Sequence, residues 1–120
     1  GWRSILVDPK AQQIAQLNDA FRRGDPNVPG ISVITAGVDH LLNQLDTPPQ
    51  ELAQLVAQFD DFSEHNDPHL EHDFGAFVFH GHKLFWKIDA YNSDYSMGSD
   101  DPTDLSKTHR VLTIMLADEY

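Results

Sequence analysis

The stretch DFGAFVFHGHKLFWKIDAY (73–91) decides the fold, because its apolar residues recur with a period of two over most of its length. Such alternation is typical of strands that bury one face. The pattern predicts two strands, Phe74–His80 and Lys83–Tyr91, joined across Gly81 and His82 as a tight hairpin.

The two faces of this predicted hairpin differ in chemistry. One face is apolar and is the expected core side, with Phe77, Phe79, Leu84, Trp86 and Ile88. The other face is aromatic and charged, with His72, Phe74, Val78, Phe85, Lys87, Asp89 and Tyr91. This register places Tyr91 opposite His72 and Asp89 opposite Phe74, whereas a slip of one residue would exchange the faces.

Two main helices are predicted before the hairpin. The first runs from about Pro9 to Arg23, with Asp8 as its cap, and buries a stripe made by Ile14, Leu17 and Phe21. The second follows the turn at 46–49 with Thr47 as its cap, and buries Leu52, Leu55, Val56, Phe59 and Phe62.

Shorter elements complete the prediction. Ile31–Thr35 is β-branched and predicts a strand, and Val38–Leu45 predicts one helical turn or a short helix. Arg110–Ala117 is expected to be a third sheet strand, although its composition also allows a helix. The order predicts a single α+β domain over 1–120, with the two main helices packed on a small, mainly antiparallel sheet around the central hairpin. Residues 1–8 are expected to form a loose N-terminal segment.

The composition narrows the function classes. The 120 residues are 40% hydrophobic and carry a net charge of −11, as expected for one acidic globular domain. Direct nucleic-acid binding is not expected, because that affinity comes largely from Lys and Arg displacing counterions. The chain has no cysteine, so disulfides and thiolate zinc sites are excluded. No apolar run approaches the roughly 18 residues of a membrane span and no signal peptide is recognised, so we expect a cytoplasmic protein without a membrane partner.

Histidines and carboxylates gather just before and within the hairpin. Five of the seven histidines lie between His65 and His82. Imidazole and carboxylate bind divalent metals where thiols are absent, so the candidate ligands are His65, His69, Glu71, His72 and Asp73. The spacing lacks a helical HExxH pattern, and His80 and His82 are expected to be solvated turn residues. We therefore predict no cofactor, with a divalent metal as the alternative.

A second group of polar residues follows one predicted strand. Lys87, Asp89 and Tyr91 alternate along it, and the hairpin would bring His72 beside them. A His–Asp pair can act as an acid–base couple, so the catalytic candidates are His72, Asp89, Tyr91 and Lys87. The competing interpretation is that Lys87 and Asp89 are ordinary solvent-side neighbours. No complete catalytic signature is present, so enzyme activity stays open and a non-enzymatic role is favoured.

An acidic, turn-rich loop at 92–106 supplies candidates for partner binding: Asp94, Asp100, Asp101 and Asp104. An anionic surface attracts a basic partner by long-range steering. The leading hypothesis is a small acidic interaction protein that engages a basic protein surface. The alternative is a small metal-dependent or acid–base hydrolase centred on His72, Asp89 and Tyr91.

Several motifs mark a resemblance that extends over residues 12 to 120: LNDAFRR (17–23), TAGV (35–38), EHDFGAF (71–77), FWKIDAY (85–91), GSDDPTD (98–104) and THRVLTIMLADEY (108–120). The chain resembles an uncharacterised family of small bacterial proteins, a domain of unknown function frequently encoded on plasmids and other mobile elements. The family usually has tyrosine-glycine at His69-Leu70, and tyrosine and aspartate at Ala90 and Asn92. His69 is thus not a family feature, which weakens the metal hypothesis.

The mobile-element setting of the family implies an accessory or anti-defence role, such as inhibition of a restriction or CRISPR effector. The implied partner is the basic surface of a nucleic-acid-processing effector. A small polyanion can occupy a basic nucleic-acid channel, which agrees with the charge of this chain.

Overall fold

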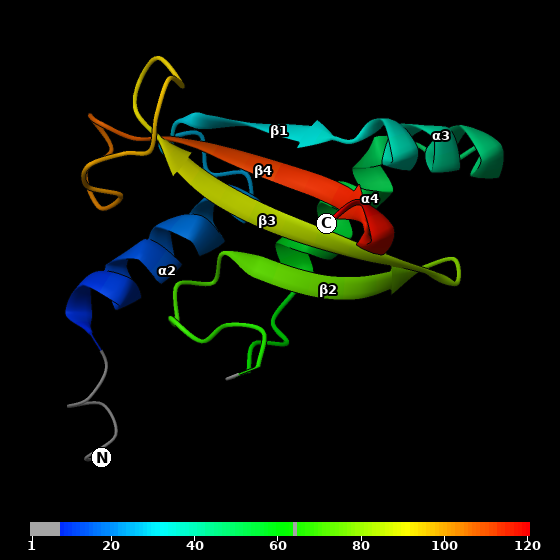
Figure 1. Cartoon of the computed structure of the whole chain (residues 1–120), viewed down its shortest axis with the longest axis horizontal. Coiled ribbons are helices and arrows are strands. Elements are labelled where there is room, and N and C mark those ends of the chain that lie inside the picture. Colours follow the sequence, from blue (N-terminus) through cyan, green and yellow to red (C-terminus); the bar gives the residue numbers. More distant parts are fainter. Residues whose placement is uncertain (1–7, 64) are drawn as a thin grey trace.

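The computed structural model describes residues 8–63 and 65–120, which form three α-helices and a four-stranded mixed sheet (Figure 1). The elements in chain order are α2 (Pro9–Arg22), β1 (Gly30–Ile34), α3 (Ala36–Leu45), α4 (Pro49–Gln58), β2 (Phe74–Phe79), β3 (His82–Tyr91), β4 (His109–Leu116) and the 3-10 turn η1 (Ala117–Glu119). The predicted α+β class is confirmed. The loose segment expected at residues 1–8 lies outside the described residues, apart from Asp8.

The first helix follows the prediction closely at both ends. The Asp8 carboxylate accepts a hydrogen bond from the Lys10 amide at 2.9 Å, and Arg22 is the last helical residue. Gly24 follows with a φ of 87°, a left-handed conformation that glycine adopts without strain. The predicted buried stripe is only partly correct, because Leu17 and Phe21 are half-buried. The fully buried positions are instead Ala11, Ile14, Ala15, Asn18 and Arg22.

The two helices between α2 and the hairpin differ in their bounds and caps from those predicted. Val38–Leu45 belongs to a full helix, α3, whose N-terminus is capped by the Thr35 hydroxyl. The next helix, α4, starts after Pro48, and Thr47 donates its hydroxyl to the Leu45 carbonyl instead of capping. This helix ends at Gln58, so the expected continuation to Phe62 is wrong. Phe59 and Phe62 leave the helix but still pack against the core.

The sheet has the strand order β1-β4-β3-β2. The hairpin strands β2 and β3 pair antiparallel, and β3 pairs antiparallel with β4, which confirms a strand at the RVLTIMLA segment. Strand β1 lies parallel to β4 at the edge. The sheet is therefore mainly antiparallel with one parallel pair.

The hairpin register differs from the prediction by two residues. Phe79 pairs with His82, so the turn residues are His80 and Gly81 rather than Gly81 and His82. Their φ angles are 48° and 80°, as a tight hairpin turn with two left-handed residues requires. A shift by an even number keeps every side chain on its predicted face. It changes the partners, however, and Phe74 lies opposite Lys87 instead of Asp89.

The helices all pack on one face of the sheet, and α4 crosses behind it in the view of Figure 1. The core joins side chains of α3 and α4 to the predicted inner face of the hairpin: Val38, Leu41, Leu42, Leu52, Val56, Phe79, Leu84, Trp86, Ile88, Leu112 and Ile114. The opposite face has no described α-helix packed on it, although the 3-10 turn η1 brings Tyr120 against Phe74 and Phe85 there. It exposes Ile31, Val33 and Val78, of which Val78 is 69% accessible.

Candidate functional site

A pocket of about 470 Å³ opens between the segment that precedes β2 and the second half of β3. It brings together five side chains singled out from the sequence, namely His65, His69, Asp73, Lys87 and Asp89. Phe74 and the C-terminal Tyr120 add aromatic walls, with their ring centroids 5.5 Å apart. The pocket is therefore polar at its centre and apolar along one side.

Two carboxylates in the pocket have different surroundings. The Lys87 Nζ lies 3.2 Å from the Asp89 Oδ2, and both side chains are 40% exposed. Asp73 is half-buried, and burial raises its pKa above the usual value, with a further contribution from the charges of Asp67 and Asp89. Glu71, just outside the pocket, also has a raised pKa, caused first by burial and then by Asp73. The pocket thus has an excess of negative charge.

His72 does not lie in this pocket, which corrects its predicted place beside Lys87, Asp89 and Tyr91. Its Nδ1 contacts the two oxygens of Asp19 in α2 at 2.9 and 3.0 Å. Its ring stacks on Phe62, which packs against Trp86 on the helix-bearing side of the sheet. The left-handed backbone of His72, with a φ of 54°, ends the alternation expected of a strand and removes it from the face that carries Asp89.

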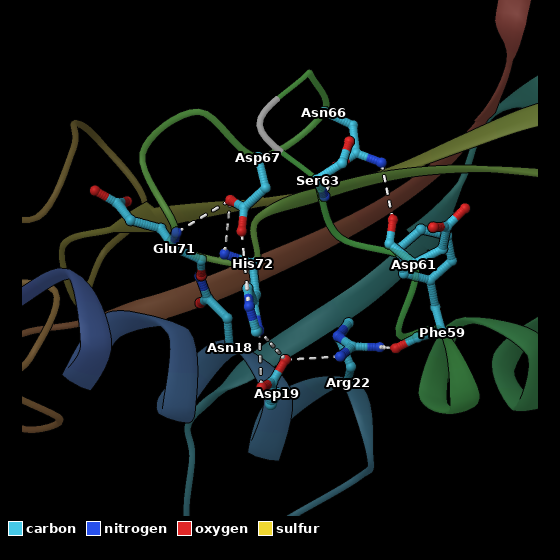
Figure 2. A network of polar contacts seen from close by, with 10 residues as sticks. All are labelled: Asn18, Asp19, Arg22, Phe59, Asp61, Ser63, Asn66, Asp67, Glu71 and His72. Atoms are coloured by element: carbon cyan, nitrogen blue, oxygen red, sulfur yellow. Dashed lines mark hydrogen bonds and ion pairs between the residues drawn. The ribbon is translucent and has the colours of Figure 1, made fainter. Parts of the chain in front are cut away.

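Asp67 holds the segment between 67 and 72 from within. Only 1% of its side chain is accessible to solvent. Its Oδ1 accepts hydrogen bonds from the backbone amides of Glu71 and His72, at 3.1 Å each (Figure 2). Leu70 and His72 both have positive φ angles, which are uncommon for residues other than glycine. Asp67 satisfies amides that this irregular backbone would otherwise leave without partners.

Helix α2 ties the same segment to the core. Arg22 donates to the Asp19 Oδ1 at 2.6 Å and to the Phe59 carbonyl at 2.9 Å (Figure 2). Its guanidinium also lies over the Trp86 ring, 5.0 Å from the centroid. Asn18 donates to the Glu71 carbonyl at 2.9 Å. The Phe59 and Glu71 carbonyls are more than thirty positions from their donors in the sequence, so these hydrogen bonds connect α2 to distant segments of the chain, including the one that borders the pocket.

A buried arginine extends this network to the acidic loop. Arg110 in β4 is fully buried, and its Nε donates to the Asn18 Oδ1 at 2.7 Å. One Nη donates to the Pro102 carbonyl at 2.8 Å. Burial lowers the pKa of Arg110 from its ordinary value. Asn18 therefore links the pocket wall, through Glu71, to the loop, through Arg110.

The acidic loop after β3 is held by local hydrogen bonds. Asp94, Asp101 and Asp104 accept from Ser96, Thr103 and Ser106 respectively, and these bonds lower the pKa of each carboxyl. The Thr108 hydroxyl donates to the Asp101 carbonyl at 2.9 Å. Asp94 and Asp100 are exposed, and Asp101 and Asp104 are partly exposed.

Tyr91 belongs to this loop end of the sheet rather than to the pocket. It pairs with His109 in β4, forms an isolated bridge to Gly98, and its ring lies 6.4 Å from that of Tyr95. Lys87, Asp89 and Tyr91 do share one face of β3, as alternate residues must. Only the first two of these three line the pocket.

The candidate metal ligands do not converge. Within 8–63 and 65–120, no three His, Cys, Asp or Glu side chains form a group that could hold a metal ion. His65, His69 and Asp73 line the pocket, whereas His72 contacts Asp19 and Glu71 lies outside. A metal centre built from the five predicted ligands is thus not formed.

The supporting residues Asp19, Arg22, Asp67, Asn18 and Arg110 were not singled out from the sequence. One signal was present, because Asn18 and Arg22 are four residues apart in LNDAFRR and so lie on one helix face with Ala11, Ile14 and Ala15. Burial of these polar side chains could not be read from that spacing. Nothing in the sequence around Asp67 indicates that its carboxylate is buried.

The fold and the pocket define a small α+β domain with helices on one face of its sheet only. It has a charged pocket at one edge of the sheet and an acidic loop held by local hydrogen bonds. The chain belongs to a family described as "Protein of unknown function (DUF3768)", whose model matches residues 34–119. That range contains the whole hairpin, the acidic loop and every lining residue of the pocket except Tyr120, and it leaves α2 outside. No curated protein and no solved structure matches the chain. No described helix has the length and apolar character needed to cross a membrane.

Proposed function

We propose that this protein is a non-enzymatic interaction protein that uses the sheet face opposite its α-helices to engage a basic surface of another protein. The observation that supports this most directly is the sheet face opposite the helices. It exposes Ile31 and Val33, with 49% and 39% of their surface accessible, and carries the ion pair of Lys87 and Asp89. The apolar side chains lie on the edge strand β1 and the ion pair on β3, so this face presents both kinds of group that protein interfaces combine.

The charge of the chain supports a basic partner. The chain carries a net charge of −11, and the acidic loop adjoins the end of β3 and β4 that borders this face. Asp94, Asp101 and Asp104 are ionised at neutral pH, as aspartates with an ordinary pKa are, and their hydrogen bonds lower the pKa of each further. A basic surface would therefore be attracted and oriented by this end of the molecule. A nucleic-acid-processing effector with a basic channel has that chemistry, as an accessory or anti-defence role would require.

The test compares two variants with the same change in charge. One carries Asp94→Asn, Asp100→Asn, Asp101→Asn and Asp104→Asn, and the matched control carries amides at exposed positions elsewhere: Asp39, Asp46, Glu51 and Asp60. We expect the wild type and the control to capture the same basic partner, and the loop variant to lose it. Capture should also fall steeply as the salt concentration rises from about 50 to about 200 mM, because salt screens attraction between exposed charges. Equal capture by both variants, or a partner that is not basic, would contradict the proposal.

An acid–base hydrolase is the second candidate, and the pocket favours it in one respect. Asp73, whose pKa is raised by burial, lines the same pocket as His69 and Lys87, and perturbed carboxyls are common in catalytic sites. The residues would then be those of the pocket, without His72 and Tyr91. Hydrolysis of ester and phosphoester panels by wild type but not by Asp73→Asn would support an enzyme. A metal-dependent version additionally requires metal in untagged protein or a shifted melting temperature with zinc, manganese or nickel.

A further inference from the structure

Asp73 has an environment that a bound cation would improve. No described side chain donates a hydrogen bond to its carboxylate or forms an ion pair with it, although the group is half-buried. Its pKa is raised by burial and by the neighbouring carboxylates of Asp67 and Asp89. Its own backbone amide and His69 lower the pKa, but burial and the two carboxylates outweigh them, so the surroundings disfavour the charged form, and such a group in a pocket is a candidate for binding a ligand.

The pocket walls next to Asp73 are aromatic. Phe74 lies beside Tyr120 with an interplanar angle of 66°, and both rings contact Phe85, at 5.1 and 5.5 Å between centroids. Tyr120 is 77% exposed, so part of this aromatic wall remains open to an incoming group. Carboxylate oxygens beside aromatic rings suit a cation that can stack as well as donate hydrogen bonds.

The internal cation of the pocket is held weakly. Lys87 pairs with Asp89 at 3.2 Å, but both side chains are substantially exposed. Exposed pairs of this kind contribute little net stability, so a second cation can share or replace Lys87 without a large loss. Lys87 therefore competes with an incoming cation for Asp89. It does not form an ion pair with Asp73.

We propose that this pocket binds the guanidinium group of an arginine side chain presented by the partner, with Asp73 and Asp89 as acceptors and Phe74 and Tyr120 as the stacking wall. The inference rests on the proposed function, because it names the partner group that enters the site. Arginine fits better than lysine for two reasons. Its planar fork can donate two parallel hydrogen bonds to one carboxylate, and it stacks on aromatic faces with a smaller loss of hydration.

The experiment uses blocked Gly-Arg-Gly, Gly-Lys-Gly and Gly-citrulline-Gly peptides as probes, titrated into isotope-labelled protein by NMR. Citrulline has nearly the shape of arginine without its charge. We expect shifts concentrated at Asp73, Phe74, Lys87 and Tyr120, with affinity highest for the arginine peptide, several-fold lower for lysine and undetectable for citrulline. Shifts spread over the acidic loop, or equal binding of all three peptides, would overturn the inference.

Three variants sharpen this test. Asp73→Asn should weaken the arginine peptide by about five- to tenfold, since a charge-assisted hydrogen bond is replaced by a neutral one. The matched control Asp100→Asn lies outside the pocket and should leave the affinity unchanged. Lys87→Met should strengthen binding by about two- to fivefold, because it removes the competing cation. Unchanged or weaker binding by Lys87→Met would show that Lys87 does not compete with the arginine for this site and would overturn the inference.

The two proposals can fail separately. If the arginine peptide does not bind in the pocket while the loop variant still loses its basic partner, the arginine site is wrong and the interaction function stands. If the peptide binds as predicted while the loop variant captures the partner like wild type, the pocket stands and the proposed role of the acidic loop is wrong.

Discussion

The imidazole of His72 lies parallel to the ring of Phe62, with 3.8 Å between the ring centroids and 1° between the planes. The same imidazole contacts the Asp19 carboxylate through Nδ1. These contacts join the segment before β2 to α2 on the side of the sheet that carries the helices. His72 is therefore a positioning residue for one wall of the pocket.

Replacing His72 should release this wall. His72→Ala removes the stacking contact and the hydrogen bonds to Asp19, and we expect a loss of about 2–3 kcal/mol in the free energy of unfolding. Urea denaturation measures this loss, and faster proteolysis within 65–72 would locate it. His82→Ala is the control, because His82 is exposed at the start of β3 and should change stability by less than about 0.5 kcal/mol. Equal stability of the two variants would contradict the assignment.

Asp67 should contribute through its side-chain acceptor. Asp67→Ala leaves the amides of Glu71 and His72 without partners inside the protein, with an expected loss of about 2–4 kcal/mol. Asp67→Asn retains one acceptor oxygen and should lose roughly half as much. Thermal or urea unfolding distinguishes the two variants. Asp100→Ala, at an exposed carboxylate, is the control, and an Asp67→Ala protein as stable as that control would show that Asp67 does not hold the segment.

Asp73→Asn should stabilise the protein at neutral pH. The folded pKa of Asp73 is raised, so the folded state binds more protons than the unfolded state, and stability falls as pH rises from the unfolded pKa of about 4 through the folded pKa. The amide removes this loss, so we expect a gain in the free energy of unfolding at pH 7, which solvent screening of this partly exposed group keeps small. Unfolding curves at pH 7 and pH 3.5 test the sign, because the gain should disappear at the lower pH. A loss of stability at pH 7 would mean that the carboxylate has a compensating partner.

Gly75 should not tolerate a side chain. A Cβ at this position would overlap the indole of Trp86 and the ring of Phe59, both part of the packed interior. We expect Gly75→Ala to destabilise the protein by about 1–3 kcal/mol through overpacking. Gly98→Ala is the matched control, since its added Cβ would meet only the Ala90 carbonyl oxygen at 3.9 Å. Equal melting temperatures would show that the indole can move.

Local pattern predicted the elements where one rule governed a whole segment. Period-two alternation identified both hairpin strands and their inner face, and Asp8-Pro9 identified the start of α2. The turn was misplaced by one residue because His80 takes a left-handed conformation that a sequence pattern assigns more readily to glycine. The end of α4 was misplaced because Phe59 and Phe62 continue the helical period although their rings reach the core from outside the helix.

The hairpin from 73 to 91 was determined by the sequence itself, since strand alternation and side-chain facing depend only on neighbours along the chain. Only the tertiary structure decided which polar residues meet. His72 lies away from Lys87 and Asp89 because its own backbone is left-handed and because its side chain contacts Asp19, 53 positions earlier in the chain. Asp73, Lys87 and Asp89 were joined in one pocket with Tyr120 by the pairing of β2 with β3 and the return of the C-terminus over that face. Such contacts depend on burial and long-range packing, which a short sequence pattern does not encode.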